Sequence, residues 1–192
     1  MATYNFHLGD LVTGSTGVWG QGTAYAVGLY MQEFFDAVCG SPLTPYSDSD
    51  FWWNTSPGGV RANEVLVYFV SNKSESLVKQ VSAGTGLGPG GTTRIHGSAN
   101  LSEVYVAESL SAMGGGSDIA RGLAVLAFHE AMHNKLKLGN SLHAVGGGGM
   151  ASTTVFANTQ INAKNIAKMA PSLSLAVPQE TKFLEGLPQS SS

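Results

Sequence analysis

The chain has 192 residues, a formal net charge of −3 and only 12% charged residues. Its 10 basic residues are scattered, so neither nucleic acid nor an anionic membrane surface is expected as a partner. Cys39 is the single cysteine, which excludes an intrachain disulfide. The length fits one domain with a sizeable core, 1–192, with an N-terminal part of about 1–138 and a C-terminal part of about 139–192.

The same composition bears on where the protein acts. No apolar run reaches the length of a membrane span, and the first residues lack the basic and apolar regions of a signal peptide. A surface poor in charge and rich in Gly, Ser, Thr and Asn is more common in exported proteins. We therefore favour secretion without a recognisable signal peptide over a cytoplasmic location.

The first half of the chain alternates between strand and helix patterns. A short strand over Thr3–Leu8 is followed by a glycine-rich loop and a helix over Thr23–Cys39, which Gly40 ends. Residues 41–59 contain three prolines and the triplet Phe51-Trp52-Trp53, which predicts a long ordered loop. This aromatic loop is either part of a substrate wall or a lid over the core.

The middle of the chain predicts more strands. The run Glu64–Val70 is β-branched and aromatic, which is typical of a strand buried on both faces. A short helix is expected at Ser74–Val81, an edge strand at Thr92–His96 and another strand at Glu103–Ala107. The glycines between 83 and 91 lack the Gly-Lys-Ser/Thr ending of a phosphate-binding loop, so a flexible turn is favoured.

A long apolar helix is predicted next. Ser117 is a suitable N-cap and Asp118 places a negative charge in the first turn. No proline interrupts Ile119–Leu138, and Gly139 suits the position that follows a helix. The helix is apolar on most of its circumference, so we expect it to be buried.

This helix carries the motif H-E-x-x-H, formed by His129, Glu130 and His133. Two histidines four residues apart lie on one helix face and can both bind one metal ion, while the glutamate can act on a water molecule without being a ligand. Unpaired polar groups are costly in a core, and a zinc ion with its water satisfies all three side chains. The alternative is two core histidines that happen to flank a glutamate.

Catalytic zinc needs a third protein ligand and an open position for water. His143 is the only histidine after the motif, and we predict it as that ligand. Glu180, Glu185 or a residue from earlier in the chain would complete the site if His143 does not. His7 and His96 are expected to be ordinary core or surface residues. Four glycines and Met150 follow His143, and a final helix is expected from about 153 to 170, stopped by Pro171. Phe156 is expected near the apolar face of this helix, and Ile161 and Met169 off it.

One set of residues carries a resemblance to a known family: His129, Glu130, His133, Gly139, His143 and Met150. Their pattern resembles that of the metzincins, zinc peptidases with H-E-x-x-H-x-x-G-x-x-H and a later Met-turn. The likeness extends over roughly residues 60 to 170. Here the glycine comes three residues later than in that pattern, and the step to the third histidine is one residue longer. Three residues are close to one helical turn, so the helix could continue about 5 Å further before the chain returns.

The resemblance implies a zincin-like α/β (α+β) domain with a small mixed sheet, a substrate-binding edge strand, a long active-site helix and a C-terminal helix after the Met-turn. It also implies that Met150 lies beneath the metal. The expected activity is that of a zinc metalloendopeptidase, in which Glu130 is the general base for a zinc-activated water and His129, His133 and His143 hold Zn²⁺.

Two alternatives remain: a secreted toxin or effector with the same chemistry, and a non-catalytic binding protein on the same scaffold. The expected partners are a protein or peptide substrate and, for an effector, a dedicated inhibitor or immunity protein.

Overall fold

The computed structural model of the protein describes residues 4–13, 19–39, 49–53, 65–77, 91–93, 101–113 and 118–172. These residues form a mixed α/β arrangement, as the alternation of strand and helix patterns predicts. None of the described helices has both the length and the apolar character needed to span a lipid bilayer.

The sheet has five strands in the order β2-β1-β3-β5-β4. Their bounds are Tyr4–Leu11 for β1, Ser49–Trp53 for β2, Val65–Val70 for β3, Gly91–Thr93 for β4 and Leu101–Tyr105 for β5. The first three and β5 run parallel, whereas β4 pairs antiparallel with β5 at the edge. The predicted edge strand therefore exists over Thr92 and Thr93, and residues 94–96 lie outside the described part.

Strand β3 is buried along its whole length, as its continuous apolar run predicts. Side chains alternate between the two faces of a strand, and two apolar clusters follow that alternation. Val65, Val67 and Phe69 join the main core, while the residues between them pack with Leu101 and Tyr105 of β5. The central strand thus anchors the sheet on both sides.

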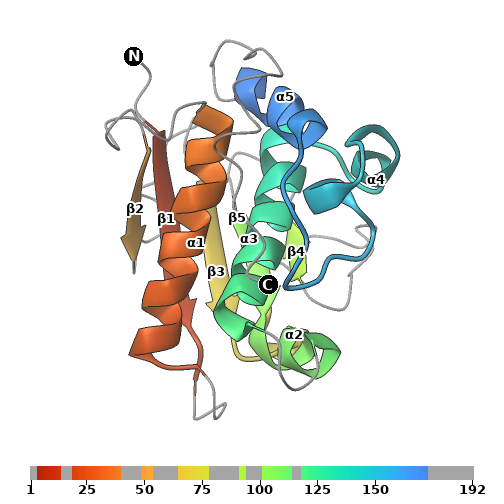
Figure 1. Ribbon diagram of the computed structural model, residues 1–192. Helices are drawn as coiled ribbons and strands as arrows, with labels where there is room; N and C mark the ends of the chain where they lie inside the picture. The colour runs from red at the N-terminus through yellow and green to blue at the C-terminus, as the bar shows by residue number, and fades with distance from the viewer. Residues whose placement is uncertain are drawn as a thin grey trace.

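Five α-helices are described: α1 (Gln21–Cys39), α2 (Val106–Met113), α3 (Ile119–Leu136), α4 (Ser141–Val145) and α5 (Ala163–Ser172). Two 3₁₀ turns accompany them, η2 (Lys73–Glu75) and η4 (Gly149–Ala151). Helices α1 and α3 lie side by side across one face of the sheet, and α5 contacts both (Figure 1).

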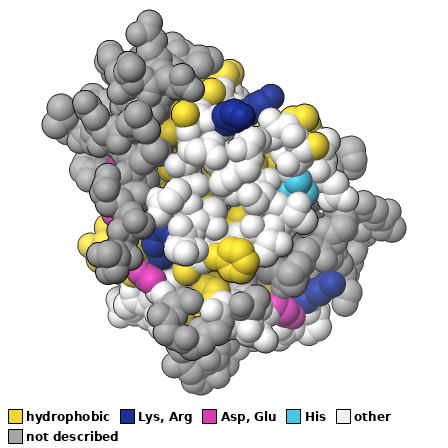
Figure 2. Space-filling view, turned by 45° about the vertical axis from the view of Figure 1, so that its right-hand side comes forward, with side chains coloured by type: hydrophobic (Ala, Val, Ile, Leu, Met, Phe, Trp, Pro, Cys, Tyr) yellow, Lys and Arg dark blue, Asp and Glu magenta, His cyan; other side chains and the backbone are white. Residues whose placement is uncertain are grey.

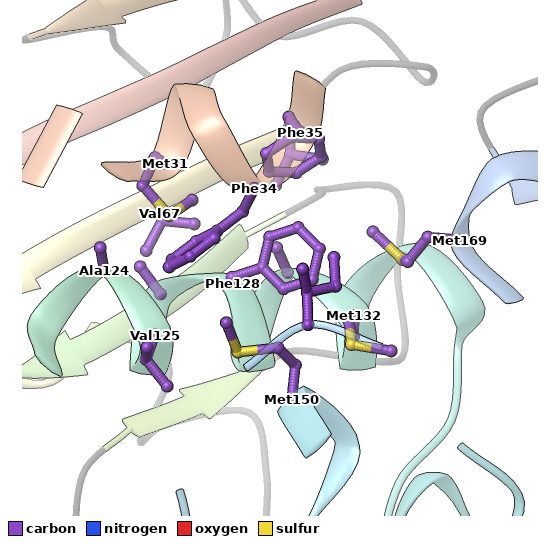
Figure 3. Packing of buried hydrophobic residues seen from close by; sticks show 14 of the residues in the cluster. Met31, Phe34, Phe35, Val67, Ala124, Val125, Phe128, Met132, Met150 and Met169 are labelled. Carbon is purple, nitrogen blue, oxygen red and sulfur yellow. The ribbon is translucent and has the colours of Figure 1, made fainter. Parts of the chain in front are cut away.

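Aromatic packing joins α1 to α3. Phe34 and Phe35 of α1 meet Phe128 of α3 edge to face, with ring centroids 5.6 Å and 5.0 Å apart (Figure 3). All three rings are fully buried. Such pairs contribute about 0.5–1.5 kcal/mol each beyond the burial of their apolar area. Phe128 directly precedes His129, so this packing fixes the helix where the motif begins.

The ends of α3 differ from the prediction. The N-cap is Asp118 rather than Ser117, because the Asp118 carboxylate accepts a hydrogen bond from the backbone N–H of Arg121 at 2.9 Å. The hydroxyl of Tyr30 also donates to this carboxylate at 2.6 Å, which raises the pKa of Tyr30 to about 12. The helix therefore starts where expected, with a different capping residue.

At the other end, α3 stops at Leu136, and Gly139 is not the residue that ends it. Lys137 adopts the left-handed conformation with φ 54 and donates its N–H to the carbonyl of Asn134, while Leu138 N–H donates to the carbonyl of His133. This pair of bonds is a Schellman motif, which satisfies the last free carbonyls of a helix. The expected extra turn of helix is therefore absent.

Other predicted elements change as well. The segment 41–59 contains strand β2, which pairs parallel with β1 over Phe51, Trp52 and Trp53. The helix expected at Ser74–Val81 is only the 3₁₀ turn η2 in the described residues, because the Asn72 side chain accepts from Ser74 N–H and closes a tight turn. Strand β5 ends at Tyr105 and runs directly into α2, which the sequence reading missed.

The C-terminal helix is shorter than predicted. Instead of running from about 153 to 170, α5 spans Ala163–Ser172 and includes Pro171. Asn162 explains the late start, since its side-chain oxygen accepts a hydrogen bond at 2.9 Å from the backbone N–H three residues later and so caps the helix.

The buried face of this segment also differs from the prediction. Phe156, expected on the apolar face of the helix, lies before α5 and is 58% exposed. Ile161 and Met169, expected off that face, are fully buried. The helix start at residue 163 explains the change for Phe156 and Ile161, because residues before it do not follow helical spacing. Met169 lies within α5, whose buried residues are Asn165, Ile166, Met169 and Ala170.

Candidate metal centre

Helix α3 places His129 and His133 one turn apart on the same face. Their ring centroids are 4.7 Å apart and their Nε2 atoms approach to 3.1 Å. His129 is buried, whereas His133 is only partly buried. The two imidazoles therefore point at a common position, as the H-E-x-x-H spacing predicts.

Helix α4 brings His143 to this pair. Four residues, 137–140, separate α3 from α4, and the His143 ring lies parallel to that of His129 with centroids 5.4 Å apart. Its centroid is 5.1 Å from that of His133. One ring nitrogen from each histidine lies within 4.8 Å of the others, so the three residues could hold a metal ion. The nonstandard spacing is absorbed in the segment between α3 and α4.

A backbone carbonyl holds each of the three rings at Nδ1. The Nδ1 atom of His129 lies 2.7 Å from the Met150 oxygen, that of His133 lies 2.6 Å from the Leu138 oxygen, and that of His143 lies 3.0 Å from the Ala151 oxygen. A carbonyl oxygen can only accept, so Nδ1 carries the proton in each ring. In the neutral imidazole, Nε2 is then left with a lone pair for a metal.

The electrostatics of the pair favour a bound cation. Burial and the neighbouring His133 lower the pKa of His129 to about 4, and burial also lowers the pKa of His133. Both rings are thus neutral at pH 7, and two unprotonated Nε2 atoms 3.1 Å apart cannot share a hydrogen bond. A metal ion between them resolves this contact of lone pairs, and imidazole nitrogens are donors that Zn²⁺ prefers.

Glu130 directly follows His129 in the sequence of α3 and is 6% exposed. Its backbone carbonyl accepts a hydrogen bond from Ser102 Oγ at 3.1 Å, and Asn134 Nδ2 donates to the same hydroxyl at 3.2 Å. This buried network ties α3 to β5 at the level of the motif. Two other candidate ligands, Glu180 and Glu185, lie outside the described residues.

The segment after α4 is a tight turn that ends in η4. Gly147, Gly148 and Gly149 have φ values of 82, 74 and 57, which a residue with a side chain rarely adopts. Met150 follows and is fully buried, and its sulfur-bearing side chain lies among the core residues near α3 (Figure 3). The turn therefore offers the Met150 carbonyl to His129 and places the Met150 side chain in the core.

Replacing Met150 by Leu is expected to cost less than about 1.5 kcal/mol of stability, because the volume is nearly conserved. The substitution keeps the backbone carbonyl that His129 contacts, so metal binding should stay at the wild-type level. Urea unfolding and metal titration measure the two effects. A large loss of metal with little loss of stability would show that the Met150 side chain itself acts on the site.

The site is open to solvent on one side. His133 and His143 are partly exposed. Figure 2, in which the side that carries α4 is turned forward, shows histidine atoms at the surface among mainly uncharged atoms. A water molecule can therefore approach the histidines from this face.

The described part of the chain adds no fourth residue to this group. His7 is buried in β1, outside the metal-binding group of the described residues. The described part of the chain does not include His96, the glycine-rich segment 84–88 or the side chains of Cys39, Phe51, Trp52 and Trp53. The carbonyl partners of the three imidazoles could not be predicted from the sequence, because backbone atoms leave no pattern in it.

In comparisons with known proteins, no protein-family model, curated protein or solved structure matches this chain. The metzincin resemblance therefore stays a prediction from the sequence motif.

Proposed function

We propose that this protein is a zinc-dependent metalloendopeptidase. One observation carries the proposal: His129, His133 and His143 each donate Nδ1–H to a backbone carbonyl and gather their remaining nitrogens in one place. Carbonyl partners of this kind fix the tautomer and orientation of metal-binding imidazoles.

The donor set supports zinc as the metal. Three imidazole nitrogens with no thiolate match the catalytic zinc sites that keep a fourth position for water. A structural zinc site is closed by four protein ligands, whereas two of these three histidines are partly exposed. Imidazole also binds copper, nickel and cobalt, so metal analysis is part of the test.

Glu130 supplies the acid–base chemistry in this proposal. It neighbours His129 and lies three residues before His133, so the helix keeps its side chain beside the histidines. A zinc ion, when bound, lowers the pKa of a coordinated water and polarises the scissile carbonyl. Glu130 takes the proton from the attacking water and passes it to the leaving amine nitrogen. A carboxylate in this role needs no direct bond to the metal.

The edge strand β4 supports a peptide as substrate. It is the last strand of the sheet in the described residues, and it lies against α3, which carries the motif. An extended peptide can pair its backbone with an exposed sheet edge, which presents alternate side chains to pockets. A peptide bound along β4 would lie beside the sheet strand that contacts the helix carrying the motif.

The test combines metal analysis with a cleavage assay. Protein purified without chelators is expected to contain one zinc per chain by mass spectrometry. It should cleave a denatured protein mixture, lose activity with 1,10-phenanthroline and regain it with zinc. The double variant His129→Ala/His133→Ala is the control for a contaminating protease. Absence of any transition metal from the wild type would refute the proposal, and metal without cleavage would indicate a non-catalytic metal-binding protein.

A further inference from the structure

We infer that Asn165 of α5 is a positioning residue for the metal centre, acting on His129 and His143 through the backbone turn at residues 146–151. The inference rests on the metal centre of the proposed function. It assigns a role to a side chain that lies on another helix and makes its hydrogen bonds to backbone groups rather than to the three histidines.

The carboxamide of Asn165 is fully buried and uses its complete hydrogen-bonding capacity. Its Oδ1 accepts from the N–H of Met150 at 3.0 Å and from the N–H of Asn162 at 3.2 Å. Its Nδ2 donates to the carbonyls of Gly146 at 2.9 Å and Gly148 at 2.8 Å. Three of these four partners belong to the turn, so one side chain fixes the turn from both ends.

The same turn supplies the carbonyls that orient two imidazoles. Met150, whose N–H is held by Asn165, offers its carbonyl to His129 Nδ1. The next residue, Ala151, offers its carbonyl to His143 Nδ1. A shift of this segment would therefore move two of the three rings together, which is why a residue outside the site can control its geometry.

The glycines of the turn let the asparagine come this close. A Cβ added at Gly149 would lie 2.6 Å from Asn165 Oδ1 and 2.5 Å from Asn162 Nδ2, closer than real Cβ contacts. At Gly147, with φ +82, a Cβ would lie 2.6 Å from Lys164 Cδ. Gly147 and Gly149, which the zinc chemistry alone leaves unexplained, are thus required for the close contact between the turn and the start of α5.

The Asn165 side chain also takes part in capping α5, because its Oδ1 accepts a hydrogen bond from the backbone N–H of Asn162 at 3.2 Å. Loss of stability alone would therefore not distinguish positioning from capping. The readout that separates them is the metal centre itself: its affinity for Zn²⁺ and the visible absorption of the Co²⁺-loaded protein, which depends on ligand geometry.

The experiment compares Asn165→Ala with the matched control Lys168→Gly. The alanine variant leaves a small polar cavity that water can enter, so the fold should survive. Its Zn²⁺ affinity, measured by competition with a chromophoric chelator, is expected to fall about tenfold, with a changed Co²⁺ spectrum. Lys168 is exposed on α5, and a glycine there weakens the helix without touching the turn. The control should keep the wild-type affinity and spectrum.

A folded Asn165→Ala protein with wild-type Zn²⁺ affinity and Co²⁺ spectrum would overturn the inference. If this variant does not fold, Asn165→Asp replaces it, since the aspartate keeps volume and acceptor but cannot donate to the two glycine carbonyls; the same two readouts decide. Failure of the peptidase proposal is recognised separately, because the wild type would then bind metal without cleaving peptides while the effect of Asn165 on affinity persisted.

Discussion

Replacing Glu130 by Gln is expected to lower kcat about 10²- to 10⁴-fold, the usual contribution of a general base. The amide has nearly the shape of the carboxylate, which matters at a position that is only 6% exposed. It cannot accept a proton from water, so the chemical step loses its base. The backbone carbonyl that binds Ser102 is untouched, and the helix should keep its place against β5.

The same variant should bind one zinc per chain with wild-type affinity, because the three imidazoles and their carbonyl partners are unchanged. Metal content by mass spectrometry and kcat on a fluorogenic peptide measure the two effects. Glu75→Gln, at an exposed position in η2, is the matched control and should keep full activity. If Glu130→Gln retained most of its activity, another residue would have to be the base.

Much of what positions the site could be predicted from the sequence. The continuous apolar run of β3 predicts a strand buried on both faces, and the structure confirms it over Val65–Val70. The long apolar segment before His129 predicts a buried helix, and α3 is the element that packs on both α1 and the sheet. In both cases a single local property, apolar character without breakers, is enough to determine the element.

The end of α3 could not be predicted in the same way. Glycine is the usual residue for a left-handed position after a helix, so Gly139 was expected there. Lys137 takes that position with φ 54, at a cost of about 1–2 kcal/mol for a residue with a side chain. Its ammonium donates to Asn134 Oδ1 at 3.3 Å, a local contact that helps to offset this cost. The turn then presents the Leu138 carbonyl to His133.

The C-terminal part was harder to predict because its structure depends on polar side chains rather than on apolar periodicity. Asn162 ends an irregular segment by capping α5, and Asn165 binds the glycine turn. Neither contact leaves a pattern in the sequence, since asparagine is common in loops. Arg121 of α3 adds a third contact of this kind by donating to the carbonyls of Ala157 and Thr159.

His143→Ala is the second variant for which we expect a large effect. The residue provides one of three imidazoles, and the binding free energy of a structural zinc site, about 10–16 kcal/mol, is shared among four ligands. Loss of one ligand should therefore weaken zinc binding about 10²- to 10³-fold and abolish turnover. Alanine is a good helix former and the His143 side chain is partly exposed, so α4 and the core should remain folded.

Zinc competition titration, peptide cleavage and urea unfolding of the apo protein test these three expectations. Ser141→Ala, an exposed position of the same helix, is the matched control and should leave all three unchanged. The comparison also tests whether His143 is the third zinc ligand despite its unusual spacing from the H-E-x-x-H motif. The structure gathers His143 with the motif pair because α3 ends early and α4 begins after Asn140, so the ring reaches Ala151 and its two partners. Wild-type zinc affinity in His143→Ala would contradict this assignment. Another residue, such as Glu180 or Glu185, would then have to be the third ligand.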